Sequence, residues 1–179
     1  MKNRPGPIFQ VGILTVSDTR ARGLRTDTTT AKIRDALAQA GFAIREARLV
    51  PDDLQRIREE LLDMADRLTL PLVVTTGGTG FGARDVTPEA TKAVIEREVP
   101  GLPEAMRAAT ARGNPLAWLS RGIAGLRGRT LIVNLPGSPR AVEECLRVLL
   151  PLLPHALEML EGRPHGPRYI SATTLNLQR

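Results

Sequence analysis

The chain has 179 residues, 42% of them hydrophobic and only 3% aromatic, with a formal net charge of +6. This length suits one domain with a real core, and the single cysteine, Cys145, excludes an intrachain disulfide and favours a reducing compartment. No stretch reaches the ~18 uncharged apolar residues of a membrane span, and the first ten residues lack the apolar segment of a secretory signal, so we expect a cytoplasmic protein without a membrane partner.

The positive charge comes mostly from arginine, because lysine occurs only at Lys2, Lys32 and Lys92. A basic balance is compatible with nucleic acid, an acidic surface or phosphorylated small molecules. No stretch interleaves aromatic residues with a basic run, which is the usual platform for single strands. We therefore expect no nucleic-acid partner, and a solvated arginine-rich surface is the simplest interpretation of the charge.

Short apolar runs and helical spacing alternate along the chain. The runs predict strands at 11–16, 43–50, 72–76, 122–126 and 130–135. The spacing predicts helices at 29–40, from Asp52 to about 68, from Thr87 to about 98, briefly after Pro103, and from Ser138 to a break at Pro151 and Pro154. We expect an arm at 1–9, one domain at 10–162 and an irregular tail at 163–179.

This alternation predicts an α/β fold, with a mostly parallel sheet covered by helices on both faces. The two strands within 122–135 are joined by a short turn and should pair antiparallel, so the sheet is expected to be mixed. Open sheets of this kind bind ligands beyond the carboxyl ends of their strands. That rule selects the loops at 17–18, 51–52, 77–85 and 134–138 as candidate sites.

The strongest local signal is the segment Thr75-Thr76-Gly77-Gly78-Thr79-Gly80, which leaves a buried strand and is followed by Gly82. Glycines allow backbone N–H groups to approach an anion, and the N-terminus of a following helix favours negative charge. The segment is neither a Walker A motif nor a Gly-x-Gly-x-x-Gly motif. We interpret it as a cradle for a phosphate or similar ligand; the alternative is a tight turn that merely requires positive φ angles.

Two aspartates stand at the ends of predicted strands. Asp52 follows the second strand, and Asp85 ends the glycine-rich loop ahead of Thr87 and Pro88, which are expected to cap and open a helix. Carboxylates at this edge could hold Mg²⁺ together with phosphate oxygens. The structural alternative for Asp52 is an N-cap of the next helix, and the residues alone leave both alternatives open.

The segment Asn134-Leu135-Pro136-Gly137-Ser138-Pro139 follows the last predicted strand and opens a helix. Its backbone and Ser138 could bind an anion, or Ser138 could be only a helix cap. Ser17 and Asp18 at the end of the first strand could contact a ligand or form a turn. Cys145 lies within a helix beside apolar residues and is expected to pack in the core.

Several of these segments together resemble the MoaB/Mog family of molybdenum cofactor biosynthesis. The matching pieces, in the family's order, are Thr15-Val16-Ser17-Asp18, Val50-Pro51-Asp52, Thr75 to Gly80, Arg84-Asp85-Val86-Thr87-Pro88-Glu89-Ala90-Thr91, Leu119-Ser120-Arg121 and Asn134 to Pro139. The resemblance implies a three-layer α/β/α domain that forms a trimer or a dimer of trimers. It implies transfer of AMP from ATP to the phosphate of molybdopterin, with Mg²⁺, and release of pyrophosphate. Contacts with molybdopterin synthase and with the molybdate-inserting enzyme are implied as well.

The resemblance also assigns residues. It implies that Asp52 and Asp85 are catalytic and hold Mg²⁺. The implied contacts to molybdopterin or ATP are Ser17, Asp18, Gly77, Gly78, Thr79, Gly80, Ser120, Asn134, Pro136, Gly137 and Ser138. The chain departs from the family after Asp27, where Thr28-Thr29-Thr30 replaces a Ser-Gly-like pair. The alternatives are a non-catalytic molybdopterin carrier of the same fold and a related nucleotide-processing enzyme.

Overall fold

The structure, a computed structural model, describes residues 9–163. The arm and tail that the sequence predicts lie outside these residues, except for Phe9 and Arg163. The strands are β1 (Gln10–Val16), β2 (Ala43–Val50), β3 (Leu72–Thr76), β4 (Arg97–Glu98), β5 (Ala124–Arg127) and β6 (Thr130–Leu135). The helices are α1 (Asp18–Ala21), α2 (Thr28–Gln39), α3 (Leu54–Leu62), α4 (Thr87–Lys92), α5 (Gly101–Ala111), α6 (Pro139–Leu149) and α7 (Leu153–Leu160). A π-helical turn, η1 (Asp63–Arg67), extends α3, and a 3₁₀ turn, η2 (Pro115–Leu119), precedes β5.

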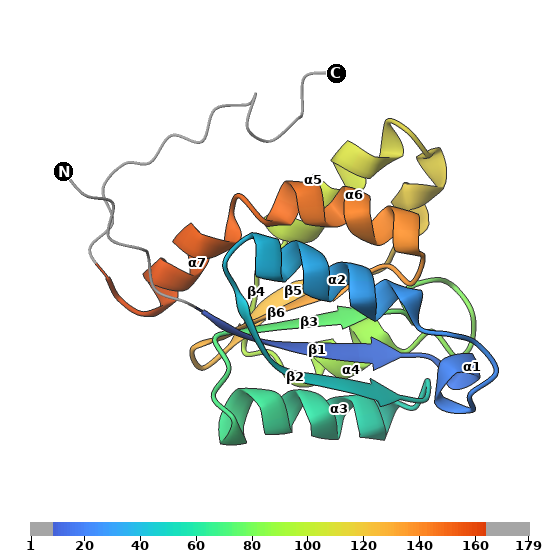
Figure 1. Cartoon of the computed structure of the whole chain (residues 1–179), viewed down its shortest axis with the longest axis horizontal. Helices are drawn as coiled ribbons and strands as arrows, with labels where there is room; N and C mark the ends of the chain where they lie inside the picture. The colour runs from blue at the N-terminus through green and yellow to red at the C-terminus, as the bar shows by residue number, and fades with distance from the viewer. Residues whose placement is uncertain (1–8, 164–179) are drawn as a thin grey trace.

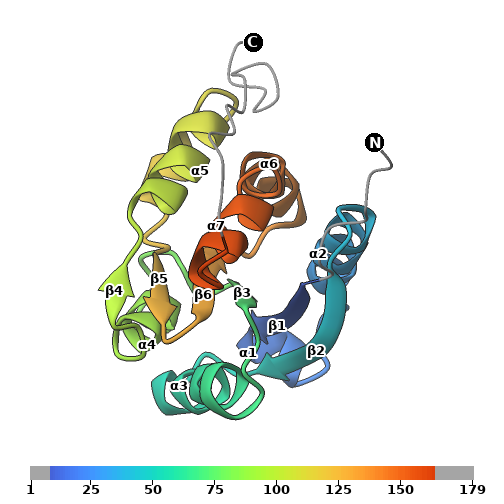
Figure 2. The ribbon, with the colours of Figure 1, turned by 90° about the vertical axis from the view of Figure 1, so that its left-hand side faces the viewer.

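The six strands form one mixed sheet in the order β2-β1-β3-β6-β5-β4. The first four strands run parallel, and β5 and β4 are antiparallel to their neighbours. Helices α2, α5, α6 and α7 cover one face, and α3 and α4 cover the other (Figures 1 and 2). The predicted α/β fold with a mostly parallel, mixed sheet in three layers is confirmed.

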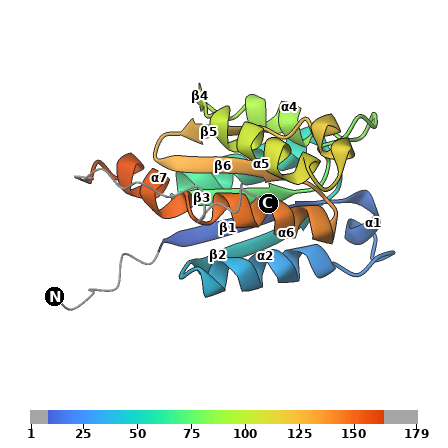
Figure 3. The ribbon, with the colours of Figure 1, turned by 90° about the horizontal axis from the view of Figure 1, so that it is seen from above.

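Each face of the sheet has its own apolar core. Alternate residues of one strand enter different cores, as with Ile13 and Leu14 of β1, because successive side chains of a strand point to opposite faces. Figure 3 looks onto the face that α2, α5, α6 and α7 cover. Cys145 of α6 is buried in that core, as predicted, and burial raises the pKa of its thiol to about 12.

Several predicted boundaries are wrong. The strand expected at 122–126 spans Ala124–Arg127, and the helix expected briefly after Pro103 begins at Gly101 and has 11 residues. Phe9, which the sequence placed in the arm, is buried and packs against Phe42, with ring centroids 6.3 Å apart. The helix expected to reach about residue 98 ends at Lys92, and Arg97 and Glu98 instead pair with β5 at the sheet edge. Two residues are too few for a strand period to show in a sequence, so only the pairing partner reveals β4.

The carboxyl ends of β1, β2, β3 and β6 lie along the same edge of the sheet, where α1 also lies (Figure 1). This parallel arrangement gathers the four loops that the sequence selected. No helix within residues 9–163 is long and apolar enough to cross a membrane.

Candidate functional site

Asp18 and Asp52 are joined across the ends of β1 and β2 by a reciprocal pair of hydrogen bonds. The backbone N–H of Asp18 donates to Oδ2 of Asp52 (2.7 Å), and the backbone N–H of Asp52 donates to Oδ1 of Asp18 (3.1 Å). Each carboxylate thus accepts a hydrogen bond from a backbone N–H of the other loop. The exchange keeps two acidic side chains next to each other at the strand ends.

The N-cap of α3 is Asp53 and not Asp52, which corrects one of the two interpretations left open by the sequence. The side chain of Asp53 accepts a hydrogen bond from the backbone N–H of Arg56 (2.9 Å), and its backbone is extended, as a cap requires. Asp52 stands one residue earlier and does not cap the helix. Its carboxylate is therefore not explained by a structural role in α3.

The glycine loop, residues 77–86, connects β3 to α4. Gly77 and Gly78 have φ angles of +98° and +62°, a region that strongly favours glycine. A β-carbon on Gly77 would stand 2.2 Å from the carbonyl oxygen of Val16, and one on Gly78 would stand 2.4 Å from Thr87 Oγ1 and 3.1 Å from Asp52 Oδ1. The missing side chains therefore bring the loop backbone against β1 and close to Asp52.

The sequence predicted that Thr87 caps α4, but in the structure Thr87 holds the glycine loop in place. Its hydroxyl donates to the carbonyl of Gly77 (2.9 Å), its backbone N–H donates to the carbonyl of Gly78 (3.1 Å), and α4 has no side-chain cap. Asp85, near the loop's end, accepts a hydrogen bond from the N–H of Gly82 through Oδ2 (2.8 Å). The positive φ angles and these bonds give the loop a defined shape.

The three aspartates differ in their electrostatic surroundings. Burial raises the pKa of Asp52, and the negative charges of Asp18 and Asp85 raise it further. The pKa of Asp18 is lowered, chiefly because Arg84 donates two hydrogen bonds to its carboxylate (3.1 and 3.0 Å). The site thus combines a partly buried, charge-crowded carboxylate with an arginine from the glycine loop.

The acidic residues alone do not enclose a metal ion, because no group of three or more His, Cys, Asp or Glu residues within 9–163 is arranged to hold one. Mg²⁺ is commonly held by one or two carboxylates together with substrate phosphates and water. Oδ1 of Asp52 would stand 3.1 Å from a β-carbon on Gly78, so this carboxylate oxygen lies close against the backbone of the glycine loop. These residues fit an ion that is completed by a bound phosphate.

The proline turn, residues 136–138, follows β6 and lies next to the glycine loop. The N–H of Gly77 donates to the carbonyl of Leu135 (3.3 Å), and a β-carbon on Gly137 would stand 3.3 Å from the Cα of Gly77. Ser138 caps α6 by accepting from the N–H of Ala141 (3.2 Å), which is one of the two roles that the sequence left open. The carbonyl of Pro136 accepts from the hydroxyl of Thr76 (2.7 Å).

Asn134, a candidate ligand residue, has its side chain bonded within the protein. Its amide nitrogen donates to the hydroxyls of Thr75 (3.0 Å) and Thr91 (2.9 Å), and its amide oxygen accepts from the N–H of Ile123 (3.2 Å). The residue is 2% exposed. The side chain ties β6 to β3, to α4 and to the segment before β5.

Ser17 and Ser120 also have local partners. Ser17 caps the short helix α1 by accepting from the N–H of Arg20 (3.3 Å), and Ser120 accepts from the N–H of Gly122 (3.3 Å). Ser120 lines an enclosed cavity of about 50 Å³ together with Asn134 and Pro136. Ligand pockets usually measure ~300–1,000 Å³, so this cavity is too small for a pterin or a nucleotide.

Comparison with known proteins agrees with this geometry. A family model described as a probable molybdopterin binding domain matches residues 12–155. The chain belongs to this family, the MoaB/Mog family. It is 36% identical over 172 residues to a protein of Helicobacter pylori strain J99 named molybdopterin adenylyltransferase, with 95% of each chain covered. The Escherichia coli K12 protein of the same name is 35% identical, with 86% of each chain covered.

Solved structures give the same family. The molybdopterin biosynthesis enzyme MoaB from Thermus thermophilus is 54% identical, with a TM-score of 0.83, and the match covers 88% of this chain and 99% of that one. A protein from Pyrococcus furiosus, named tungsten cofactor synthesizing protein MoaB, is 32% identical with a TM-score of 0.78, over 86% of this chain and 97% of that one.

The chain's departure from the family at Thr28-Thr29-Thr30 has a structural counterpart. Asp27 caps α2 by accepting from the N–H of Thr30 (3.0 Å) and from its hydroxyl. The hydroxyl of Thr29 donates to the carbonyl of Gly137 (3.3 Å) and accepts from Arg20 (2.9 Å). In this family member, therefore, the hydroxyls of Thr29 and Thr30 tie α2 to its surroundings.

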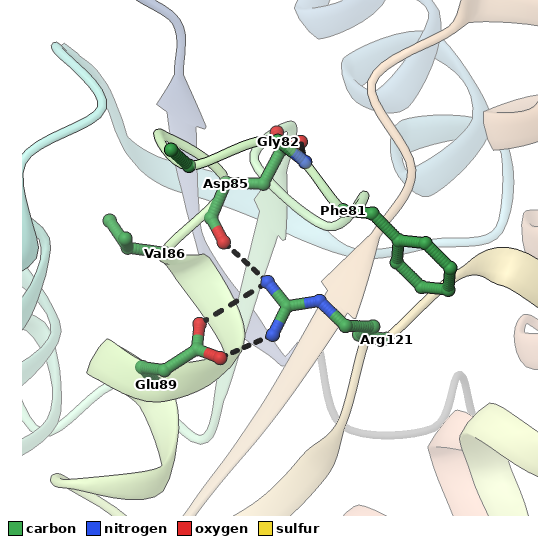
Figure 4. Close-up of a pocket in the computed structure, with 7 residues that line it drawn as sticks. Phe81, Gly82, Asp85, Val86, Glu89 and Arg121 are labelled. Atoms are coloured by element: carbon green, nitrogen blue, oxygen red, sulfur yellow. Dashed lines mark hydrogen bonds and ion pairs between the residues drawn. The ribbon is translucent and has the colours of Figure 1, made fainter.

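Two arginines at the site received no role from the sequence, although both stand within segments that resemble the family. Arg84 binds Asp18, and Arg121 contacts the glycine loop and Glu89 beside a surface hollow of about 380 Å³ (Figure 4). Each arginine directly neighbours a selected residue, Asp85 or Ser120. Being next to a selected residue was the only sequence signal for either arginine. The side chains that they bind lie 32 to 66 positions away in the sequence.

Proposed function

We propose that the protein is a molybdopterin adenylyltransferase, which transfers AMP from ATP to the phosphate of molybdopterin and releases pyrophosphate. The observation that carries the proposal is the position of Asp52, whose carboxylate borders the glycine loop without capping a helix. Relatives named molybdopterin adenylyltransferase match the chain over up to 95% of both lengths, which supports the same activity here.

The reaction joins two phosphates. An oxygen of the pterin phosphate bonds to the α-phosphorus of ATP, and the bond between that phosphorus and the oxygen of the departing pyrophosphate breaks. Both reactants are anionic, so the protein's task is to neutralise charge and to hold the phosphates in line. No protein nucleophile is required.

Different residues of the site would neutralise charge and hold the phosphates. Asp52 and Asp85 would hold Mg²⁺, which when bound supplies positive charge at the reacting phosphates. Backbone N–H groups of the glycine loop, including Gly78, Thr79 and Gly80, would cradle one anionic group. The backbone of the proline turn would receive the second, because it adjoins Gly77 at the neighbouring strand end.

A molybdopterin carrier without chemistry is the second candidate, and the acidic residues argue against it. A carrier of an anionic ligand gains nothing from the carboxylates of Asp18 and Asp52 being held next to each other at the ends of β1 and β2. The raised pKa of Asp52 means that the folded protein holds this charge at a cost in stability. A carboxylate that is held at this cost, crowded by other negative charges and not used as a helix cap supports a role in chemistry.

We propose further that the enzyme acts in the cytoplasm as a trimer or a dimer of trimers. Large apolar side chains are exposed on the surface of the single chain, including Phe81 (70% exposed) and Trp118 (59%), together with Leu116 and Leu119. Such side chains are typical of surfaces that associate. Its adenylylated product would pass to a molybdate-inserting enzyme, and molybdopterin synthase would supply the substrate.

The test is pyrophosphate release from ATP and molybdopterin, with Mg²⁺ present or removed by a chelator. The chain offers a matched pair of variants, because Asp52 and Asp53 are adjacent and asparagine caps a helix about as well as aspartate. Asp53→Asn should release pyrophosphate like the wild type, whereas Asp52→Asn should still bind molybdopterin and lose more than ~100-fold in kcat. A wild-type protein that binds molybdopterin but shows no turnover with any divalent metal would support the carrier instead.

A further inference from the structure

Arg121 connects two parts of the chain that are far apart in the sequence. It lies between η2 and β5, about 40 residues beyond the glycine loop. Its backbone N–H donates to the carbonyl of Thr79 (2.9 Å), its Nε donates to the carbonyl of Gly80 (2.7 Å), and its Nη2 donates to the carbonyl of Asp85. One residue therefore holds both the beginning and the end of the segment that carries Asp85. Figure 4 shows the contact between Arg121 and Asp85 at its end.

The guanidinium group is itself held in place. Nη1 of Arg121 forms an ion pair with the carboxylate of Glu89 in the first turn of α4, and this hydrogen bond lowers the pKa of Glu89. On the other side, Arg107 of α5 donates to the carbonyls of Ser120 (3.2 Å) and Gly122 (3.0 Å). The residues on both sides of Arg121 are thus fixed to α5, while its side chain is fixed to α4.

The glycine loop needs such an external support. Gly77, Gly78, Gly80 and Gly82 restrict the backbone less than any other residue type would, so an unsupported loop would sample many conformations. Its internal bonds join Gly82 to Asp85 and Thr87 to Gly77 and Gly78. The contacts at Thr79 and Gly80, between those two regions, come from Arg121.

We propose that Arg121 is a positioning residue that holds the glycine loop in the shape that presents its N–H groups and Asp85 to the phosphates. The inference rests on the proposed function for the role of Asp85. Arginine is required for its shape, because its planar group donates in several fixed directions at once. Lysine keeps the charge but reaches the two carbonyls and the carboxylate only as a single point donor.

The first test measures the loop directly, by hydrogen exchange at the amides of Gly82, Asp85 and Thr87 in Arg121→Ala, Arg121→Lys and the wild type. The matched control is Arg127→Ala, because Arg127 of β5 also donates to a carboxylate, that of Asp66 (2.8 and 2.6 Å), and to a backbone carbonyl, that of Val94 (3.0 Å). Both Arg121 variants should exchange at least ~10-fold faster at these amides, and Arg127→Ala should match the wild type. Unchanged exchange in Arg121→Ala would overturn the proposal.

The second test asks whether the loop's shape matters for the reaction. In Arg121→Ala, kcat for pyrophosphate release should fall ~10- to 100-fold while the KM for ATP changes less than ~3-fold, since a misplaced catalytic group lowers the rate of the chemical step. Added guanidinium ion should restore part of the rate in Arg121→Ala and none in Arg127→Ala. A variant with fast loop exchange but wild-type kcat would also overturn the proposal.

The two proposals fail in different ways. If the wild type releases no pyrophosphate, adenylyl transfer is wrong, but the loop's exchange rates and the binding of molybdopterin alone still decide whether Arg121 positions the loop. In that case Arg121→Ala should weaken molybdopterin binding by ~10-fold or more, because the cradle would be disordered. Unchanged exchange, or faster exchange with unchanged binding, would show that Arg121 has no positioning role.

Discussion

The glycine loop and the proline turn follow neighbouring parallel strands, β3 and β6, and both lead into a helix with proline near its start. In the sequence both segments have the pattern of a strand-to-helix loop that binds an anion. In the structure the side chains of Ser138 and Asn134 serve the fold, which leaves the backbone of the proline turn to receive an anion. Ser138 caps α6, and Asn134 at the end of β6 gives its whole side chain to internal partners.

The glycine loop is built differently. Its helix has no side-chain cap, two of its glycines have positive φ angles, and Asp52, which follows β2, lies against its backbone without capping α3. The difference shows how a structural motif and a chemical one can be separated. A polar side chain whose hydrogen bonds are all internal explains the fold, whereas a partly buried carboxylate crowded by other negative charges indicates chemistry.

The largest effect is expected for Gly77→Ala, because a β-carbon would stand 2.2 Å from the carbonyl oxygen of Val16 at a φ of +98°. The free energy of unfolding should fall by about 3 kcal/mol or more. Gly128 is the control, since it has a φ of +51° with open space around it, and Gly128→Ala should cost about 1–2 kcal/mol. Gly137→Ala, in the proline turn, should cost about 1 kcal/mol. Denaturant unfolding of the three variants measures the order, and equal losses would contradict it.

Asp85→Asn should lower kcat for pyrophosphate release by ~100-fold or more, equivalent to about 2.7 kcal/mol. Asparagine keeps the oxygen that accepts from the N–H of Gly82 (2.8 Å), so the loop should keep its shape while the negative charge is lost. The measurement is steady-state turnover alongside molybdopterin binding, which should change far less. Turnover near the wild-type value would remove Asp85 from the mechanism.

Asn134→Ala should destabilise the protein by about 2–3 kcal/mol, because the hydroxyls of Thr75 and Thr91 and the N–H of Ile123 would lose a buried partner. If the side chain of Asn134 only stabilises the fold, the folded variant should bind molybdopterin with nearly the wild-type Kd. Thermal unfolding and binding should be measured on the same preparation. A large loss of affinity with little loss of stability would make Asn134 a ligand residue instead.

Ser138→Ala should cost about 1 kcal/mol of stability, the usual value for the loss of an N-cap. The backbone of the proline turn would be retained, so the KM values for ATP and molybdopterin should stay within ~3-fold of the wild type. Ser138→Asp is the companion variant: aspartate caps α6 equally well but adds a negative charge, and it should weaken substrate binding if this turn receives a phosphate. Unimpaired binding in Ser138→Asp would argue against an anion at the proline turn.

The smallest effect concerns pH. Because the pKa of Asp52 is raised above its ordinary value of 3.8, the folded protein binds this proton more tightly than the unfolded chain. The contribution of Asp52 to stability should therefore fall as the pH rises through the interval between 3.8 and the raised pKa, and this loss should be complete above it. Carboxylates whose pKa is lowered, such as those of Asp18 and Asp63, act in the opposite direction, so the effect is measured as the difference between the wild type and Asp52→Asn. Asp52→Asn removes this loss, so it should unfold at a slightly higher temperature than the wild type at pH 7 and lose its advantage in acid. A variant less stable than the wild type at pH 7 would show that the Asp52 carboxylate stabilises the fold.

The sequence alone determined the layers of this protein and the edge at which its site lies. β3 and β6 match the predicted strands in extent, since strands buried on both faces read as apolar runs bounded by glycine, proline and polar residues. The edge strand β2 matches as well, although most of its residues are only partly buried. Once parallel strands are expected, their carboxyl ends must share one edge, so the loops carrying Asp18, Asp52 and Asp85 could be grouped without coordinates.

Only the tertiary structure decided what each polar residue does at that edge. Whether Asp52 or Asp53 caps α3 depends on where the chain turns after β2, a shift of one residue that no sequence period records. The role of Arg121 depends on partners 32 to 41 positions away, which long side chains reach across the fold. Local patterns follow from the chain's own neighbours, whereas hydrogen-bond partners at a site come from whichever segments the packed sheet brings together.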